Sequence, residues 1–291
     1  MIPSILGIPS QELLIMIGGA IFIALTIFKL DKTGIGNKKV NKLLIVCIIA
    51  AFGLYFGARF FDCLWHAIDN GFFGKIPELI NEHGFFGMLF KKSSDENNPI
   101  GFFDQGGITF LGGLYGALIS YAIAYWFIFR NERHNLIHYL NYIIPGLIIA
   151  HSFGRLGCFL AGCCTGIPAN PPFGVKFPAI DNPVLPTNLY EALFLLILFF
   201  VVLFAFKKHQ TKIYMVSYGI GRFFLEFLRG DSRGKLPFID WLSPSQLLSI
   251  ILLIVGVLLF IFEDKLTDWV KRFNKETKPK DINKGKKKAN A

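Results

Sequence analysis

Four side chains with helical spacing mark the segment from residue 218 to residue 229. Tyr218, Arg222 and Glu226 recur every four positions, and Arg229 follows three residues later. Side chains three or four positions apart lie on one face of a helix. Arg222 and Glu226 alone are compatible with an intrahelical ion pair that lowers the cost of placing charge in an apolar helix. The additional positive charge of Arg229 favours an anion site, and phosphate suits it because guanidinium groups bind phosphate oxygens through paired hydrogen bonds.

Two further arginines stand in apolar surroundings. Arg59 lies in the stretch GARFFD, and Arg155 lies in HSFGRLG. A charge at the centre of a membrane helix costs at least ~2.5 kcal/mol on insertion scales, so both side chains are expected to face protein or a polar cavity. Thr187 is a predicted helix N-cap. Tyr190 and Glu191 then fall in the first turn of that helix, where a carboxylate also suits the helix dipole.

Glycines lead into another apolar segment. The stretch DQGGITFLGGLYGA places Gly106 and Gly107 before the segment and Gly112 and Gly116 inside it. Gly112 and Gly116 form a small-xxx-small pair, which lets a second helix approach closely. Gly106 and Gly107 are suited instead to expose backbone N–H groups to an anion.

Three of the five cysteines, Cys158, Cys163 and Cys164, follow Arg155 closely. An odd number of cysteines allows at most two intramolecular disulfides and leaves at least one thiol. Three roles stay open for these residues: a disulfide, free packing thiols, and a reactive or metal-binding role. The spacing is poor for a zinc motif, because a vicinal pair is not one and His151 lies seven residues before Cys158. We therefore predict no metal site.

Membrane helices are the elements that must position these residues. Of the 291 residues, 53% are hydrophobic and 17% are charged, which is too apolar for a soluble protein of this size. A hydrocarbon core of about 30 Å needs roughly 20 mainly apolar residues per helix. We expect an all-α membrane protein with seven transmembrane helices, at about residues 12–28, 43–65, 108–129, 137–159, 189–206, 213–228 and 247–262.

The distribution of lysine and arginine predicts the orientation. Basic residues gather in segments 29–42, 130–133 and 207–212 and in the tail from residue 263. Short basic loops stay in the cytoplasm, so we expect the N-terminus outside and the C-terminus in the cytoplasm. We expect no cleavable signal peptide. Topology and attraction to anionic lipid explain the net charge of +10, so no nucleic-acid partner is expected.

The predicted organisation has two parts. Residues 1–262 form the transmembrane domain, with an outer arm at about 67–105 and an outer head loop at about 160–188. Residues 263–291 form a basic cytoplasmic tail. Within the arm, the segment from Ile76 to Phe90 looks amphipathic and predicts an interfacial helix on the outer leaflet, with a simple connecting loop as the alternative.

Four separated segments resemble those of the prolipoprotein diacylglyceryl transferase family. They are, in the family's order, GARFFD, GGITFLGGLYG, HSFGRLGCFLAGCCTGIPANPPFGVKFP with LPTNLYEAL, and SYGIGRFFLEFLRGD. The resemblance covers most of residues 58–231 and implies a seven-helix enzyme of the bacterial cytoplasmic membrane with its active site toward the outer leaflet. The implied reaction moves the diacylglyceryl group of phosphatidylglycerol to the lipobox cysteine thiol of a preprolipoprotein and releases glycerol 1-phosphate. No cofactor is implied.

The resemblance also assigns roles by motif position. Arg155 and Arg222 would be catalytic, neutralising the leaving phosphate, with Glu226 and Tyr218 orienting them. The expected substrate-binding residues are Arg59, Gly106, Gly107, Gly112, Gly113, Gly154, Gly157, Tyr190, Glu191 and Arg229. The expected partners are phosphatidylglycerol, the signal peptides of preprolipoproteins and membrane lipids.

The chain departs from the family pattern at five positions. The family commonly has asparagine at the positions of Cys158 and Ala161, glutamate at that of Cys163, and histidine at those of Leu111 and Leu185. General-base help from the two histidine positions is therefore not expected. Two alternatives stay open: an enzyme of the same fold that passes a lipid group to another acceptor, and a non-catalytic phospholipid-binding or transport protein.

Overall fold

Helices dominate the computed structural model, which describes residues 4–5, 8–69, 71–93, 99–104, 109–230 and 241–276. The α-helices of this part are α1 Ser10–Asp31, α2 Asn37–Asp69, α3 Ile76–Phe90, α4 Phe110–Ile128, α5 Leu136–Ala161, α6 Thr187–Phe204, α7 Gln210–Glu226 and α8 Pro244–Glu276. Short 3-10 helices are η1 Phe72–Lys75, η2 Phe102–Asp104 and η3 Arg133–Asn135, and β1 Ser4–Ile5 pairs with β2 Ile8–Pro9 in a small hairpin. The predicted all-α class is confirmed.

Six helices in the described part of the chain are long and apolar enough to cross a membrane, namely α1, α2, α4, α5, α6 and α8. They match six of the seven predicted spans, and the protein is therefore a multi-pass membrane protein. The remaining predicted span, 213–228, corresponds to α7. This helix has 17 residues and carries Lys212, Arg222 and Glu226, so length and composition alone do not mark it as a span.

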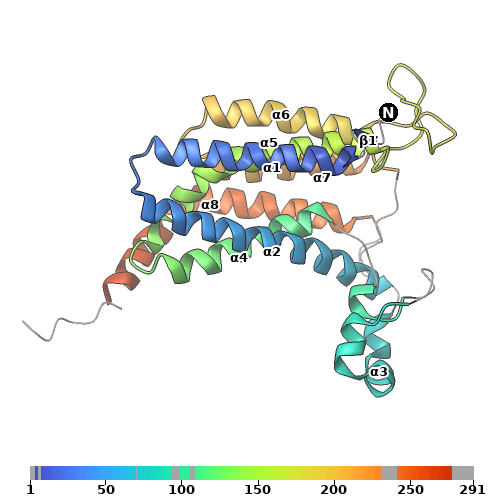
Figure 1. Ribbon diagram of the computed structural model, residues 1–291, viewed down its shortest axis with the longest axis horizontal. Helices are drawn as coiled ribbons and strands as arrows, with labels where there is room; N and C mark the ends of the chain where they lie inside the picture. Colours follow the sequence, from blue (N-terminus) through green and yellow to red (C-terminus); the bar gives the residue numbers. More distant parts are fainter. Residues whose placement is uncertain are drawn as a thin grey trace, which may run out of the picture.

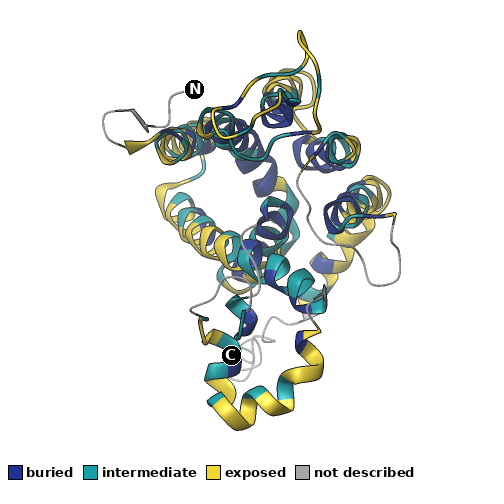
Figure 2. Cartoon of the chain, turned by 90° about the vertical axis from the view of Figure 1, so that its right-hand side faces the viewer, coloured by how far each residue is buried: buried dark blue, intermediate teal, exposed yellow. Residues whose placement is uncertain are grey.

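Most of the helices run side by side along the long axis of the molecule, as Figure 1 shows. The closest neighbours are α2 with α4, α1 with α5, α7 with α8, and α5 with α6. Tyr125, Ile144 and Leu195 are among the fully buried side chains between them. Exposed residues gather on the outward sides of the helices and along α3 (Figure 2). Large apolar side chains such as Phe52 and Ile197 are exposed there, which suits contact with lipid.

Glycines allow the close contact between α2 and α4. A side chain at Gly116 would overlap the backbone carbonyl of Gly53, and one at Gly112 would meet the carbonyl of Gly57. Gly113 lies in the same interface, where a side chain would meet Ala58. The prediction that Gly112 and Gly116 form a helix-packing surface is confirmed.

The connections divide between the two ends of the bundle. The N-terminal hairpin, α3 and the loop between α5 and α6 lie at one end in Figure 1, and the links α1–α2, α4–α5 and α6–α7 lie at the other. The helix predicted within the outer arm is confirmed as α3, which bends at Gly84 and exposes Phe85 and Phe86. α8 continues past residue 262 to Glu276, so the start of the predicted tail is helical.

Candidate active site

Two buried arginines from different helices meet at one carboxylate. Arg155 lies near the end of α5, Arg222 lies near the end of α7, and Glu191 stands in the first turns of α6. The Nε atom of Arg155 lies 3.2 Å from Oε2 of Glu191, and Nη1 of Arg222 lies 4.0 Å from the same oxygen. Residues that are distant in the sequence thus form one charged centre, at the end of the bundle that carries the α5–α6 loop.

Glu226 gives Arg222 a second carboxylate partner. Nη2 of Arg222 lies 2.6 Å from Oε2 of Glu226, and the hydroxyl of Ser243 donates to Oε1 of Glu226 at 3.1 Å. The intrahelical ion pair expected from the spacing is therefore present. It does not account for the whole site, because Arg222 also faces Glu191 on another helix.

Tyr218 and His151 complete the surroundings of Glu191. The hydroxyl of Tyr218 donates to Oε1 of Glu191 at 2.8 Å, so Tyr218 contacts the arginines' shared carboxylate. Nε of Arg155 donates to Nε2 of His151 at 3.4 Å, and the same ring nitrogen lies 3.7 Å from Oε1 of Glu191. The His151 ring stacks on Phe110 with 3.5 Å between ring centroids. Accepting at Nε2 places the proton of a neutral His151 on Nδ1.

Sequence reasoning missed His151 as a site residue, although one signal was available. His151 stands four positions before Arg155 and therefore shares its helix face. Glu191 was expected only as a substrate-binding residue, and the structure places it at the centre of the cluster. Its central position depends on the packing of α6 against α5 and α7, which local spacing does not encode.

The carboxylates of the centre do not satisfy every donor of its arginines. Arg155 and Arg222 are buried with Glu191, and Arg222 also pairs with Glu226. Nη1 of Arg222 is buried and has no hydrogen-bond partner among the described residues. Burying such a donor without a partner costs free energy, and an anionic oxygen placed beside it would remove that cost. The centre is therefore suited to bind one anion.

The first turn of α6 also holds the loop that follows α5. The side chain of Asn188 donates to the backbone carbonyl of Cys163 at 2.7 Å, and the hydroxyl of Thr187 donates to the carbonyl of Cys164 at 3.1 Å. Pro186 occupies the N-cap position of α6 and the helix begins at Thr187, so the predicted N-cap is wrong by one residue. The Thr187 hydroxyl fixes the loop instead of the helix end.

Three other predicted site residues, Arg59, Tyr190 and Arg229, contact backbone groups of other segments. Arg59 donates from Nη2 to the backbone carbonyl of Phe103 at 2.5 Å, and the hydroxyl of Tyr190 donates to the carbonyl of Phe173 at 3.3 Å. Arg229 is buried after the end of α7, where its backbone bridges to the α5–α6 loop.

The predicted glycines also differ in their surroundings. Gly154 has open space where a side chain would project, and Gly157 packs against Gln11 at the start of α1. Gly112 and Gly113 belong to the interface between α2 and α4. Gly106 and Gly107 lie outside the described residues.

Known proteins match most of this chain. A family model described as prolipoprotein diacylglyceryl transferase matches residues 6–262. A phosphatidylglycerol--prolipoprotein diacylglyceryl transferase of Clostridium tetani is 35% identical over 159 residues, which cover 50% of this chain and 62% of the relative. The second such transferase of Clostridium perfringens is 38% identical over 157 residues, with 50% and 60% covered. A Dehalococcoides mccartyi relative of the same name is 30% identical over 224 residues, with 69% and 77% covered. The chain thus spans less than two thirds of the length of these two clostridial proteins.

Proposed function

Because the chain belongs to the prolipoprotein diacylglyceryl transferase family, we propose that it transfers the diacylglyceryl group of phosphatidylglycerol to the lipobox cysteine thiol of a preprolipoprotein. Glycerol 1-phosphate is the second product. The observation that carries the proposal is the convergence of the buried Arg155 and Arg222 on Glu191, where Nη1 of Arg222 has no hydrogen-bond partner among the described residues and can donate to the phosphate of the lipid. The names of the relatives identify phosphatidylglycerol as the lipid donor and a prolipoprotein as the acceptor in those proteins.

The proposed chemistry is a displacement at carbon. The thiol sulfur attacks the glycerol carbon that bears the phosphate ester, a sulfur–carbon bond forms, and the carbon–oxygen bond breaks. The thiol proton leaves to solvent, and glycerol 1-phosphate departs with the electron pair. Arg155 and Arg222 stabilise the charge that develops on the phosphate, which is commonly a large term in catalysis. Glu191 and Tyr218 hold Arg155 in position, and Glu226 holds Arg222.

The proposed topology has seven spans, with α7 as the sixth. An α-helix of 17 residues is about 26 Å long, which approaches the thickness of the hydrocarbon core. Contacts of α7 with α8, α6 and α5 favour this assignment, because they keep Arg222 away from lipid. The basic links α1–α2, α4–α5 and α6–α7 gather at one end of the bundle, which supports a cytoplasmic location for that end.

The rest of the proposed location follows from this topology. The N-terminus and the arginine centre face the outer side of a bacterial cytoplasmic membrane, and the C-terminus is cytoplasmic. The arm at 67–105 lies on the outer leaflet through the exposed rings of Phe85 and Phe86 on α3. The head loop at 160–188 covers the outer end of the site, and the basic tail from residue 263 is cytoplasmic, where its lysines attract the anionic lipid of the inner leaflet.

The direct test is transfer by the purified protein in detergent micelles. The donor is phosphatidylglycerol labelled in its acyl chains, and the acceptor is a lipobox peptide that carries either cysteine or serine. We expect labelled thioether with the cysteine peptide and none with the serine peptide. Absence of transfer to the cysteine peptide would overturn the proposal.

A further inference from the structure

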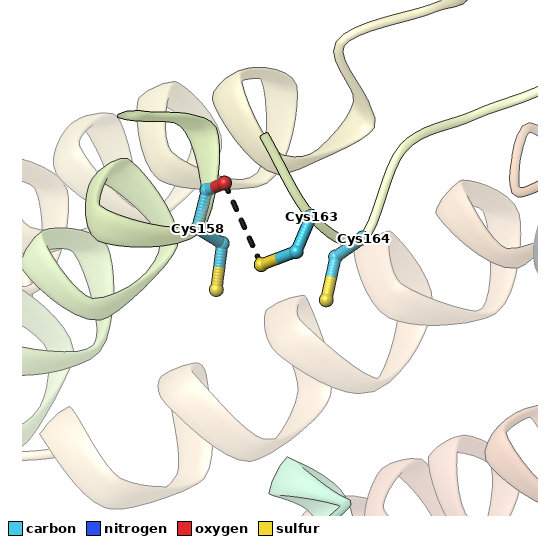
Figure 3. A group of neighbouring side chains, drawn as sticks. All are labelled: Cys158, Cys163 and Cys164. Carbon is cyan, nitrogen blue, oxygen red and sulfur yellow. Dashed lines mark hydrogen bonds between the residues drawn. The ribbon is translucent and has the colours of Figure 1, made fainter. Parts of the chain in front are cut away.

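A cluster of three thiols lies where α5 gives way to the following loop. Cys158 is in the last turn of α5, and Cys163 and Cys164 follow the turn at Gly162. The three Sγ atoms all lie within 4.8 Å of one another. Figure 3 shows the side chains converging, with the Cys163 thiol donating to the backbone carbonyl of Cys158 at 3.6 Å.

Two residues in the left-handed region of backbone space create this arrangement. Gly162 has a φ of 77° and Cys164 has a φ of 57°. Glycine adopts this conformation readily, but a cysteine there is strained. The hydrogen bonds from Asn188 and Thr187 to the loop carbonyls hold the strained turn in place. The thiols are thus held together before any ligand arrives.

We propose that Cys158, Cys163 and Cys164 form a three-thiolate site for a zinc ion whose fourth coordination position is open to the acceptor thiol. Zinc binds thiolates at about 2.3 Å, and a tetrahedron of that size separates its sulfurs by about 3.8 Å. Sulfurs that already lie within 4.8 Å of one another need shifts of only about 1 Å to reach this geometry. Three protein ligands with one open position are also the pattern of catalytic rather than structural zinc sites.

The surrounding charge suits an anionic metal complex. Three thiolates around one divalent ion leave a single negative charge. Arg155 stands three positions before Cys158 on the same face of α5, and both residues are buried. Arg229 forms an isolated β-bridge with Gly166, and Gly166 lies two residues beyond Cys164 in the sequence. Nearby guanidinium groups favour such an anion, whereas they would repel a bare cation.

The role of the open zinc coordination position, which is to bind the acceptor thiol, rests on the proposed function. Cys158 is one helical turn from Arg155, which we assign to the phosphate of the lipid. A thiol that coordinates zinc loses its proton, here to solvent, and becomes the nucleophilic thiolate. It then forms the sulfur–carbon bond as the carbon–oxygen bond to phosphate breaks. The ion would supply the activation that Leu111 and Leu185 cannot supply, because neither side chain can act as a base.

Cobalt replaces zinc as the spectroscopic probe. The purified full chain is reduced with a phosphine, freed of metal and titrated with Co²⁺. We expect one equivalent to bind with a sulfur-to-cobalt charge-transfer band. Cys163→Ser and Cys164→Ser should each lose this band. The matched control Cys47→Ser, on α2, should keep it. Absence of the band in the reduced wild type, or its retention in both serine variants, would overturn the proposal.

A second titration tests the open position. Adding a lipobox peptide with cysteine should shift the cobalt bands, whereas the same peptide with serine should leave them unchanged. Equal responses to both peptides would overturn the open position. The cobalt titration and the transfer assay give separate answers. Transfer without any cobalt binding refutes the zinc site and leaves the proposed function standing. Cobalt binding without transfer refutes the proposed function and leaves the metal site standing.

Discussion

Glu191 is the residue on which both buried arginines depend. It faces Arg155 and Arg222 through one oxygen and accepts a hydrogen bond from Tyr218 through the other. Removing one partner of a buried ion pair costs about 3–5 kcal/mol, because the remaining charge stays buried and uncompensated. The position of the proposed phosphate-binding groups therefore depends on this carboxylate.

The first prediction concerns Glu191→Gln. The amide keeps the size of the side chain and its hydrogen bond with Tyr218 but removes the charge between the two arginines. We expect the rate of transfer to fall by roughly 100-fold or more, which corresponds to about 2.7 kcal/mol. Glu132→Gln is the control, since Glu132 pairs with Lys39 at the surface of the opposite end. A transfer rate within about threefold of wild type for Glu191→Gln would contradict the assigned role.

The second prediction concerns Arg222→Gln. Loss of a preorganised charge that stabilises a developing anion typically costs 10²–10³ in rate, so we expect transfer to fall by about that factor. The protein should still insert into the membrane, because Glu226 keeps its hydrogen bond from Ser243. Arg133→Gln is the matched control, since Arg133 packs on Trp126 at the other end of the bundle. Equal activity of the two variants would refute a catalytic role for Arg222.

At this scale the sequence predicted residue types better than contacts. The spacing of Arg222 and Glu226 predicts the ion pair that the structure contains. The central position of Glu191 could not be predicted locally, since it depends on three helices meeting, whereas the spacing of His151 from Arg155 was a local signal. The thiol cluster also escaped prediction, because the left-handed conformation of Cys164 brings together sulfurs whose spacing fits no zinc motif.

Among the elements, the pair α2 and α4 is the most closely packed. The interface depends on residues without side chains, because Gly116 faces the backbone of Gly53 and Gly112 faces that of Gly57. α4 follows the predicted substrate-binding residues Gly106 and Gly107 in the sequence. Its packing therefore fixes Phe110, which stacks on His151 beside the arginines.

The third prediction tests this interface with Gly116→Ala. The added methyl group would overlap the Gly53 carbonyl, so the helices must separate. Overpacking of this kind typically costs 1–3 kcal/mol, and we expect a lower midpoint of thermal unfolding in detergent. Gly19→Ala on α1 is the control, because its methyl group would meet nothing within 4 Å. Unchanged unfolding of Gly116→Ala would show that α2 and α4 pack less closely than described.

The predicted helices were correct where the length of an apolar run determines whether a segment can span the membrane. Six predicted spans match helices of suitable length, because a long apolar run has no other stable arrangement in lipid. The ends were less predictable. α8 extends to Glu276 through polar turns, where Lys212 of α7 forms an ion pair with Glu263. Such contacts between helices stabilise a helix beyond the point at which its apolar run stops.

At the scale of the whole molecule, the distribution of charge predicts orientation. The basic links lie at one end of the bundle, and α3 and the α5–α6 loop lie at the other. Short basic loops stay in the cytoplasm, so we predict that the arginine centre faces the outer leaflet. This orientation also puts the proposed zinc site where an exported substrate arrives.

The fourth prediction tests this orientation with reporter fusions. Alkaline phosphatase, which is active only outside the cytoplasm, should be active when fused after residue 170 and inactive when fused after residue 276. A fluorescent protein that folds only in the cytoplasm should give the opposite pattern at the same two positions. Activity of the phosphatase at residue 276 would contradict the proposed orientation and the seven-span count.

In the proposed reaction, Arg155 acts on the phosphate of the lipid during transfer to a thiol. The most direct measurement quantifies the thioether peptide and glycerol 1-phosphate in the same reaction, for the wild type and for Arg155→Ala. We predict equal amounts of the two products from the wild type and neither from the variant, while the variant keeps the wild-type elution volume in detergent. Wild-type rates from Arg155→Ala, or thioether formed without glycerol 1-phosphate, would contradict this role of Arg155.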